Sequence, residues 1–405
     1  MPLDEFERTI VDEVSRRATR METDLEELVA IPTGHGNHEG LERARSWMSD
    51  RLVALGAIVE RLPGGEKPDW LREPVVESED SGEILCARAL DRSDRGIRIL
   101  LSGHLDTVHD PKGEFQLLSP RRDGIRTGPG AADMKGGLVV ALTALEVLHL
   151  RGVKARWSFI LNADEESGSF RSTEALQSIA REHDVGLVVE PAAGEGNIVT
   201  ARFGSAQFRI DAYGRSAHAG RDAAKGISAV AALCHAMTQA LAISDPSVGR
   251  TVNIGPIEGG EATNIVPDYA AAWGNARYSN DEQRDLIERA FAQIPLGSPK
   301  DLPRVTMRVL HNRPKKDATP EVLAMAKIAI EVARDMSIAV GSTSTGGVSD
   351  SNVLQAAGLP CLDGLGVRGG NLHRSDEFVV VASLAERATM LALIIHRLAE
   401  SPSVP

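Results

Sequence analysis

The chain has 405 residues, of which 42% are hydrophobic and 25% are charged, as is ordinary for a soluble globular protein. This length exceeds what one hydrophobic core usually covers, so two domains are expected. The formal net charge of -12 argues against a nucleic-acid-binding surface, because such a surface needs clustered Lys and Arg to neutralise phosphates.

The N-terminal segment, residues 1–31, mixes charged residues with apolar ones at helical spacing and lacks the uninterrupted apolar core of a secretory signal. No window approaches the ~20 apolar residues of a membrane-spanning helix. The three cysteines, Cys86, Cys234 and Cys361, do not have the spacing of a redox or metal-binding motif. We therefore expect free thiols in a cytoplasmic protein that does not associate with a membrane.

Strands and helices then alternate along the first half of the chain. The hydrophobic pattern predicts helices at 41–55, 135–150 and 172–182, strands at 97–102, 157–162 and 186–189, and a long exposed loop at 63–82. Short strands that alternate with helices of this length indicate an α/β domain, with a mainly parallel sheet and helices on both faces.

The pattern changes near residue 200. Alternation of polar and apolar residues predicts strands with one solvent-exposed face at 207–213 and 304–310. The segments 251–257 and 270–278 also resemble strands, and helices are predicted at 223–243 and 282–293. The buried α/β pattern resumes with a helix at 321–335, an apolar run at 358–363 and a helix at 383–399. We therefore predict a larger discontinuous domain, 1–199 and 314–405, and a smaller inserted α+β domain, 200–313.

Acidic and histidine residues follow the predicted strands or lie in a glycine-rich turn and a late loop. They are His104, Asp106, Asp133, Glu165, Glu166, Glu190 and His373. Open α/β sheets bind their ligands at strand ends, and carboxylates mixed with imidazoles are typical ligands of a divalent metal. The sequence therefore favours a metal centre.

Each motif also has a structural interpretation. His104 and Asp106 share a face, so the carboxylate either orients a metal-bound imidazole or caps the next loop. Asp133 precedes a helix, where it is either a ligand or an N-cap. The consecutive carboxylates at 164–166 are either a solvated loop or a metal ligand beside a general base. Glu190 after a buried strand needs a partner.

The joint order of these residues resembles that of the zinc-dependent amide hydrolases, which include aminoacylase, acetylornithine deacetylase, succinyl-diaminopimelate desuccinylase and bacterial glutamate carboxypeptidase. The resemblance covers nearly the whole chain and is strongest to the last of these. It implies a zinc-exopeptidase-like catalytic domain that holds two zinc ions, with cobalt or manganese as alternatives. It implies the following roles: His104 and Glu190 bind one ion, Glu166 and His373 bind the other, Asp133 bridges both, Glu165 is the general base, and Asp106 orients His104.

The inserted domain resembles the lid of that family, which also mediates homodimer formation. In the segment 216–220 the resemblance implies that His218 reaches into the partner's site and stabilises the oxyanion, and the alternative is a histidine of a surface loop. Asn264 and Arg277 match residues that contact substrate. Arg313 matches an arginine that binds the substrate α-carboxylate, although a hinge residue paired with a surface acid is the alternative.

The segment 345–350 resembles the family's glycine-rich loop, in which the backbone of Gly346 and Gly347 approaches the same carboxylate. Val348 and Ser349 replace the Gly-Thr of the glutamate carboxypeptidases, so a preference for glutamate stays open. The expected activity is hydrolysis of an amide bond next to a free carboxylate in a short peptide or N-acyl amino acid. The alternatives are an aminoacylase or N-acyl amino acid deacetylase, and a catalytically silent metabolite-binding protein.

Overall fold

A computed structural model of the protein describes residues 2–71, 83–89, 96–298 and 300–401. The larger domain is built on a six-stranded sheet whose strands, in spatial order, are β1 (Ala57–Leu62), β2 (Ile84–Ala89), β5 (Arg156–Asn162), β3 (Arg98–His104), β6 (Val185–Val188) and β15 (Cys361–Leu362). Strand β3 runs parallel to β5 and β6, and β6 runs parallel to β15. The β1 and β2 pairings are antiparallel. The predicted mainly parallel sheet is thus confirmed, with an antiparallel end that the sequence did not indicate.

Successive residues of the central strands pack on opposite faces of this sheet, as the period of two requires. Leu101 and Phe159 join the larger apolar core, whereas Leu100 and Ile160 join a smaller one. The larger core contains residues of α1 (Glu5–Arg16), α2 (Ala18–Val29), α3 (His38–Ala54), α4 (Gly137–Leu150), α8 (Pro320–Asp335) and α10 (Ala382–Glu400). The smaller core contains residues of α5 (Thr173–Ala180) and α9 (Asp350–Ala356). Helices therefore cover both faces, as predicted.

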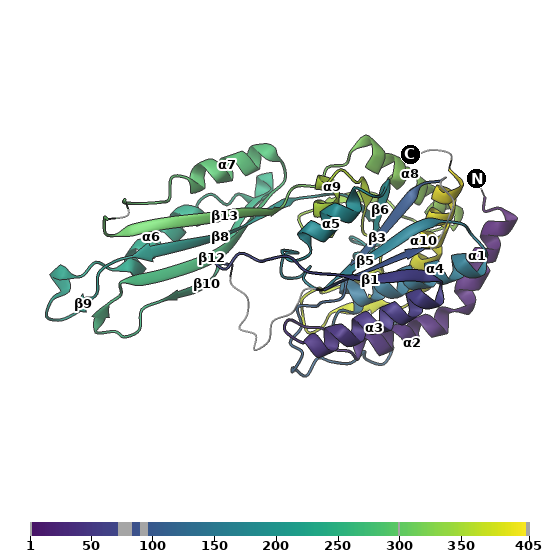
Figure 1. Cartoon of the computed structure of the whole chain (residues 1–405), viewed down its shortest axis with the longest axis horizontal. Helices are drawn as coiled ribbons and strands as arrows, with labels where there is room; N and C mark the ends of the chain where they lie inside the picture. The colour runs from purple at the N-terminus through teal and green to yellow at the C-terminus, as the bar shows by residue number, and fades with distance from the viewer. Residues whose placement is uncertain (1, 72–82, 90–95, 299, 402–405) are drawn as a thin grey trace.

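The inserted segment forms a separate antiparallel sheet that extends away from the larger domain (Figure 1). Its strands, in spatial order, are β10 (Arg250–Gly259), β12 (Tyr269–Tyr278), β8 (Gly204–Tyr213) and β13 (Arg304–Arg313). Two helices, α6 (Ala229–Leu241) and α7 (Asp281–Phe291), pack on it and form its own apolar core. A short pair, β9 (Ala217–His218) and β11 (Ile265–Val266), lies beyond this sheet.

The predicted helix at 223–243 begins later than expected. Residues Ala223–Lys225 form a single 3-10 turn, and Gly226 is extended. Helix α6 begins at Ala229 because the side chain of Ser228 accepts a hydrogen bond from Ala231 N and so provides the N-cap. The alanines before Gly226 favoured a longer helix in the sequence, but the extended glycine and the cap separate them from it.

The two connections between the domains lie side by side. Strand β7 (Ile198–Arg202) pairs with β14 (Ser342–Thr345) before the chain enters the inserted sheet at β8. The chain leaves that sheet through β13. Arg202 N then donates to Lys316 O, and Lys316 N donates to Arg202 O, each at 3.0 Å. Lys316 Nζ also donates to Thr200 O at 2.8 Å. We keep 200–313 as the proposed bounds of the inserted domain.

The predicted loop at 63–82 is better anchored than expected where it is described. Gly65 N donates to Arg171 O at 2.7 Å, and Trp273 Nε1 of the inserted sheet donates to Trp70 O at 2.7 Å. Residues 72–82 lie outside the described part of the chain. The segment 63–71 therefore joins the two domains instead of standing free in solvent.

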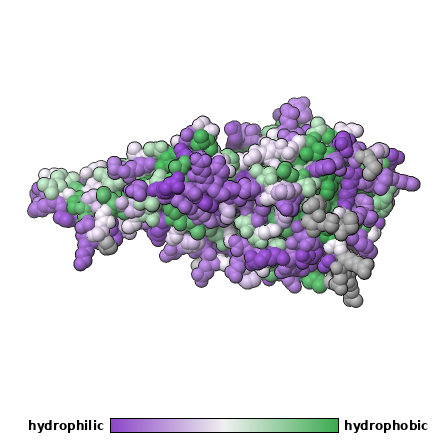
Figure 2. All heavy atoms as spheres, turned by 90° about the horizontal axis from the view of Figure 1, so that it is seen from above, coloured by the Kyte–Doolittle hydropathy of each residue, from purple (hydrophilic) through white to green (hydrophobic). Residues whose placement is uncertain are grey.

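Figure 2 shows an elongated molecule with polar residues over most of the face in view and apolar residues in small groups. Within the described ranges, no helix combines the length and the apolar character needed to cross a bilayer.

Candidate metal centre

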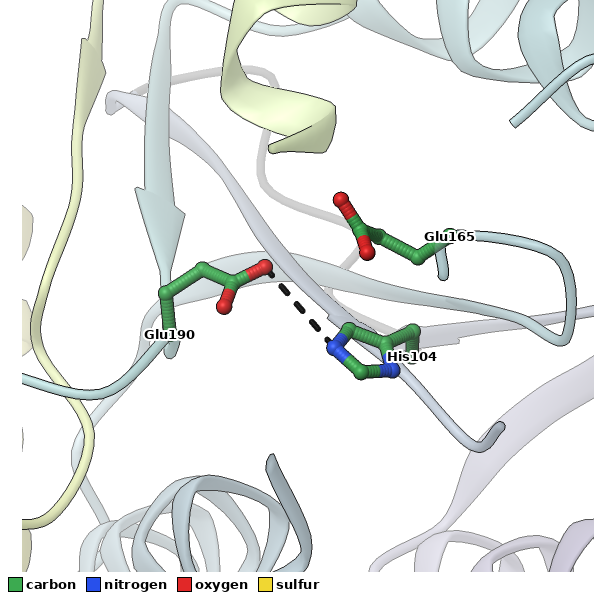
Figure 3. A group of neighbouring side chains, drawn as sticks. All are labelled: His104, Glu165 and Glu190. Carbon is green, nitrogen blue, oxygen red and sulfur yellow. Dashed lines mark ion pairs between the residues drawn. The ribbon is translucent and has the colours of Figure 1, made fainter. Parts of the chain in front are cut away.

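Parallel strands of the central sheet end at one edge, and the predicted side chains gather there. His104 is the last residue of β3, Glu165 lies just after β5, and Glu190 lies just after β6. Figure 3 shows these three side chains converging from separate segments, with the ion pair between His104 and Glu190 dashed. One ligand atom from each lies within 4.8 Å of the others. The topology thus produces the cluster that the strand-end pattern predicted.

Asp133 presents its two carboxylate oxygens to two different histidines. His104 Nε2 lies 3.3 Å from Asp133 Oδ1, and His373 Nε2 lies 3.4 Å from Asp133 Oδ2. On the outer sides, Glu190 Oε1 lies 3.9 Å from His104 Nε2, and Glu166 Oε2 lies 3.2 Å from His373 Nε2. The geometry forms two adjacent groups, each with one imidazole and one glutamate, and the aspartate lies between them.

The local backbone excludes the interpretation of Asp133 as a helix cap. Asp133 lies in the irregular turn Ala131–Gly136, with non-helical backbone angles. Helix α4 begins only at Gly137, and no side chain caps it. The turn therefore directs the Asp133 carboxylate to the histidines.

The cluster buries several carboxylates close together. Burial raises the pKa of Glu190 well above its usual value and the pKa of Glu166 to about 7. Burial also opposes ionisation of Asp133, but hydrogen bonds to His104 and His373 outweigh it and lower the Asp133 pKa. Like-charged buried carboxylates require a cation to remain ionised together. The mixed oxygen and nitrogen donors are typical ligands of a divalent metal ion.

Asp106 contacts the other ring nitrogen of His104. Nδ1 of His104 lies 3.0 Å from the backbone oxygen of Asp106 and 3.3 Å from its Oδ1. Asp106 Oδ2 accepts a hydrogen bond of 2.9 Å from Glu166 N. The residue thus connects the imidazole of one group to the glutamate segment of the other, which supports its predicted orienting role.

Glu165 has a different partner from its neighbour Glu166. Arg313, the last residue of β13, places Nη2 2.8 Å from Glu165 Oε1. The same nitrogen donates to the Glu165 backbone oxygen at 2.7 Å and to Ser169 Oγ at 2.6 Å. Arg313 is 5% exposed and Glu165 is 6% exposed. The alternative of Arg313 paired with a surface acid is therefore wrong, because its acid is buried in the cluster.

A cavity of about 460 Å³ opens over the cluster and is lined by three arginines, Arg202, Arg277 and Arg313. Arg202 is paired with Asp363 at 2.6 Å. Arg277 donates to Gly346 O at 2.9 Å. Gly347 lines the same cavity. The sequence prediction missed Arg202, although it ends β7 much as the ligands end their strands.

Residues 100–397 match the model of peptidase family M20/M25/M40. The chain belongs to this family. Carboxypeptidase G2 of Pseudomonas sp. (strain RS-16) is 28% identical over 379 residues, which cover 92% of this chain and 87% of that protein. Succinyl-diaminopimelate desuccinylase of Nitrosococcus oceani is 28% identical over 360 residues, which cover 83% of this chain and 88% of that one.

Solved structures show the same fold as this M20 chain. An M20 family metallo-carboxypeptidase from Sulfolobus solfataricus has a TM-score of 0.71 at 14% identity, covering 94% of this chain and 99% of that one. Human carnosine dipeptidase 1 has a TM-score of 0.72 at 15% identity, covering 98% and 100%. The predicted family and fold are confirmed, and the M20 match identifies a metal-dependent hydrolase.

Two predicted residues of this M20 chain lie away from the cluster. His218 is in β9 and pairs with Ile265 of β11, and Asn264 O accepts from Ala219 N at 2.9 Å. Figure 1 shows β9 at the end of the inserted domain farthest from the central sheet. His218 Nδ1 accepts hydrogen bonds from the backbone of Gly220 and Arg221, at 3.1 and 3.2 Å. In the neutral ring these bonds place the proton on Nε2, so the exposed His218 has an N–H donor there.

Proposed function

We propose that this M20 protein is a two-zinc hydrolase that cleaves an amide bond next to a free carboxylate. The observation that carries this proposal is the position of Asp133 between His104 and His373, with Glu165 facing the same cavity as Arg277. We assign His104 and Glu190 to one ion, Glu166 and His373 to the other, and Asp133 to both. When bound, the two ions lower the pKa of a water towards neutrality and polarise the amide carbonyl.

Glu165 is the proposed general base. Its carboxylate takes a proton from the attacking water and returns that proton to the leaving nitrogen, so one group serves both halves of the reaction. Its ion pair with Arg313 at 2.8 Å restrains the carboxylate of a residue that lines the cavity. The burial of both side chains restricts bulk water around the transferred proton.

Arg277, Arg313, Gly346 and Gly347 are the proposed receptors of the substrate carboxylate. Arg277 lines the cavity and donates to the Gly346 carbonyl, so its guanidinium is already positioned next to the glycine-rich segment. A fixed guanidinium suits a carboxylate, because its planar N–H groups match the two oxygens. Asn264 is a proposed substrate contact that needs the partner subunit, since it lies beside His218.

A homodimer formed through the inserted domain is part of the proposal. With Nδ1 accepting from the backbone, Nε2 of His218 suits donation to an oxyanion. Within one chain, however, β9 lies at the far end of the inserted domain (Figure 1). His218 of the partner subunit would supply a hydrogen-bond donor to that oxyanion. This arrangement would complete each site only in the dimer.

The cysteines bear on the proposed cytoplasmic location. All three are free thiols, with Cys86 and Cys361 buried and Cys234 exposed. Burial raises the pKa of Cys86 to about 11 and that of Cys361 to about 12, which keeps both protonated and unreactive. A reducing compartment suits such a chain.

An aminoacylase or N-acyl amino acid deacetylase is the second candidate, favoured by the similarity to a succinyl-diaminopimelate desuccinylase. A substrate screen of the zinc-loaded and cobalt-loaded protein separates the two candidates. The acyl group is varied against a fixed C-terminal glutamate, aspartate or neutral residue. A dependence on the amino acid side supports the carboxypeptidase activity, and a dependence on the acyl group supports the deacylase. Hydrolysis of no member would refute both and favour the silent binding protein.

Replacing Arg277 with methionine is expected to raise KM for a substrate with a free carboxylate by about 10–100-fold, because a charge-assisted hydrogen bond contributes roughly 1.5–3 kcal/mol. The measurement compares the carboxylate substrate with its carboxamide. The carboxamide should be hydrolysed equally poorly by both proteins. Arg289→Met, on the exposed side of α7, is the matched control. Equal KM values for Arg277→Met and the wild type would contradict the assignment.

Metal removal is expected to abolish hydrolysis and to destabilise the fold. Without cations the buried carboxylates of the cluster repel one another, and zinc at 100 times its Kd contributes about 2.7 kcal/mol to stability. This corresponds to a fall in Tm of roughly 3 °C for a chain of this size. Calorimetry of the EDTA-treated protein measures this fall in Tm. Zinc should restore Tm and activity, whereas magnesium should not, since it avoids imidazole ligands. An unchanged Tm would argue against occupied metal positions.

A further inference from the structure

A buried glutamate outside the proposed ligand set binds the turn that carries Asp133. Glu377 is 1% exposed. Its Oε1 accepts hydrogen bonds from Ala132 N at 2.9 Å and from Asp133 N at 3.0 Å. Its Oε2 accepts from Gly130 N at 3.3 Å and faces His109 Nε2 at 2.7 Å. Four donors therefore converge on one carboxylate, and three of them are backbone groups of a single turn.

The backbone of Glu377 joins the same turn to the loop of His373. Glu377 O accepts from Gly128 N at 3.0 Å, and Glu377 N donates to Arg374 O at 3.0 Å. The following strand β17 (Phe378–Val380) pairs with β4 (Ile125–Thr127) on one side and with β16 (Gly369–Gly370) on the other. One residue thus fixes two segments that supply ligands to both proposed metal positions.

The loop at His373 depends on such fixing. His373 has a φ of 64° and Asn371 a φ of 55°, so both occupy the left-handed region that non-glycine residues rarely adopt. The His373 side chain is 55% exposed, and packing therefore holds it only weakly. Hydrogen bonds at the end of this loop, at Glu377, are the nearest buried anchor.

The chemistry at position 377 requires a carboxylate. Both oxygens of Glu377 face N–H donors, so the amide nitrogen of a glutamine would meet a donor at whichever oxygen it replaced. The displaced backbone N–H groups are buried, and leaving them without an acceptor is costly. The turn would move to regain partners, and the Asp133 carboxylate would move with it.

We propose that Glu377 is a positioning residue of the metal centre. It holds the turn that carries Asp133, so that the two Asp133 carboxylate oxygens face His104 and His373. His109 supports Glu377 through the hydrogen bond to Oε2. This inference rests on the proposed two-metal function. It assigns Glu377 no contact with substrate or metal.

The test measures zinc binding to full-length Glu377→Gln by competition with a chromogenic chelator, together with far-UV circular dichroism and the Tm of the metal-free protein. Zinc affinity is expected to fall about 10–100-fold, as is usual when a group that orients a metal ligand is lost. His109→Ala removes one of the four donors and should cause a smaller loss. Glu386→Gln, which removes a carboxylate of α10 paired with Arg368 at 3.0 Å, is the matched control and should bind zinc normally.

Wild-type zinc affinity in folded Glu377→Gln would overturn the proposal, even if Tm falls, because a merely structural role lowers Tm alone. If Glu377→Gln does not fold, Glu377→Asp is measured in the same way. The aspartate side chain is shorter by one methylene, so its carboxylate does not reach the donors of the turn as glutamate does. Weakened zinc binding therefore supports the proposal, and unchanged zinc binding overturns it. A wild type that binds two zinc ions without hydrolysing any amide would refute the proposed activity and leave this inference standing. A wild type that binds no zinc would refute both.

Discussion

Replacing Glu165 with glutamine is expected to lower kcat by about 10²–10⁴-fold while the protein still binds zinc, because the amide cannot accept the proton of the attacking water. The proposed ligands Glu166 and Asp133 make their contacts to His373 without Glu165. Steady-state kinetics on the best substrate of the screen measure the loss. Zinc analysis of the same preparation shows that the ions are retained.

The substitution also alters an ion pair, so stability has to be measured beside activity. Glu165 Oε1 is 2.8 Å from Arg313, which keeps its hydrogen bonds to Ser169 Oγ and to the backbone of residue 165. A properly folded variant should therefore be obtained. Glu174→Gln, an exposed change on α5, is the control and should behave as wild type. Hydrolysis by Glu165→Gln above one tenth of the wild-type rate would refute the assignment of the base.

Replacing His218 with alanine is expected to lower kcat by about 10²–10³-fold, the usual loss when an oxyanion donor is removed. The distinctive prediction concerns a mixture of two inactive proteins. In a heterodimer of Glu165→Gln with His218→Ala, one site contains Glu165 from its own chain and His218 of the partner subunit. The other site lacks both groups. Complementation in trans should therefore restore activity that neither variant has alone.

The amount of restored activity follows from the symmetry of a homodimer. Random reassortment of equal amounts makes about half of the dimers mixed, each with one intact site, so about one quarter of the wild-type activity should return. Reassociation under mild denaturant, followed by an activity assay, measures this. Mixing each variant with itself is the control. If His218 acted within its own chain, neither site of the mixed dimer would be intact, and an absence of recovery would contradict the proposed role.

Periodicity was a good guide to the central strands and a poor one to the edge of the sheet. Strands β3, β5 and β6 are buried on both faces and read as continuous apolar runs. Strand β1 alternates weakly, with the burial of a half-exposed edge strand. Its antiparallel pairing with β2, the next strand along the chain, makes it a strand. The hydrophobic pattern of a half-exposed edge strand leaves little trace of that pairing in a single sequence.

The cluster of candidate metal ligands was predictable because parallel strands of one sheet bring their ends together. His104, Glu165 and Glu190 each follow a strand, so the fold class alone predicted their proximity. Glu377 carried no such signal. Its role depends on β17 pairing with β4 across about 250 residues of sequence and on backbone donors whose direction no side-chain pattern reveals. A residue that acts by accepting backbone hydrogen bonds becomes recognisable only in the structure.

The paired crossing at Arg202 and Lys316 has an evolutionary consequence. The inserted domain starts and ends at neighbouring points of the parent domain. Its insertion therefore costs the parent domain little stability, because the two chain ends that it connects already lie close together. Of the proposed carboxylate receptors, Arg277 and Arg313 belong to this insertion, whereas Gly346, Gly347 and every proposed zinc ligand belong to the parent. After gene duplication, substitutions in the inserted domain would therefore change substrate specificity, while the parent domain keeps the hydrolytic chemistry.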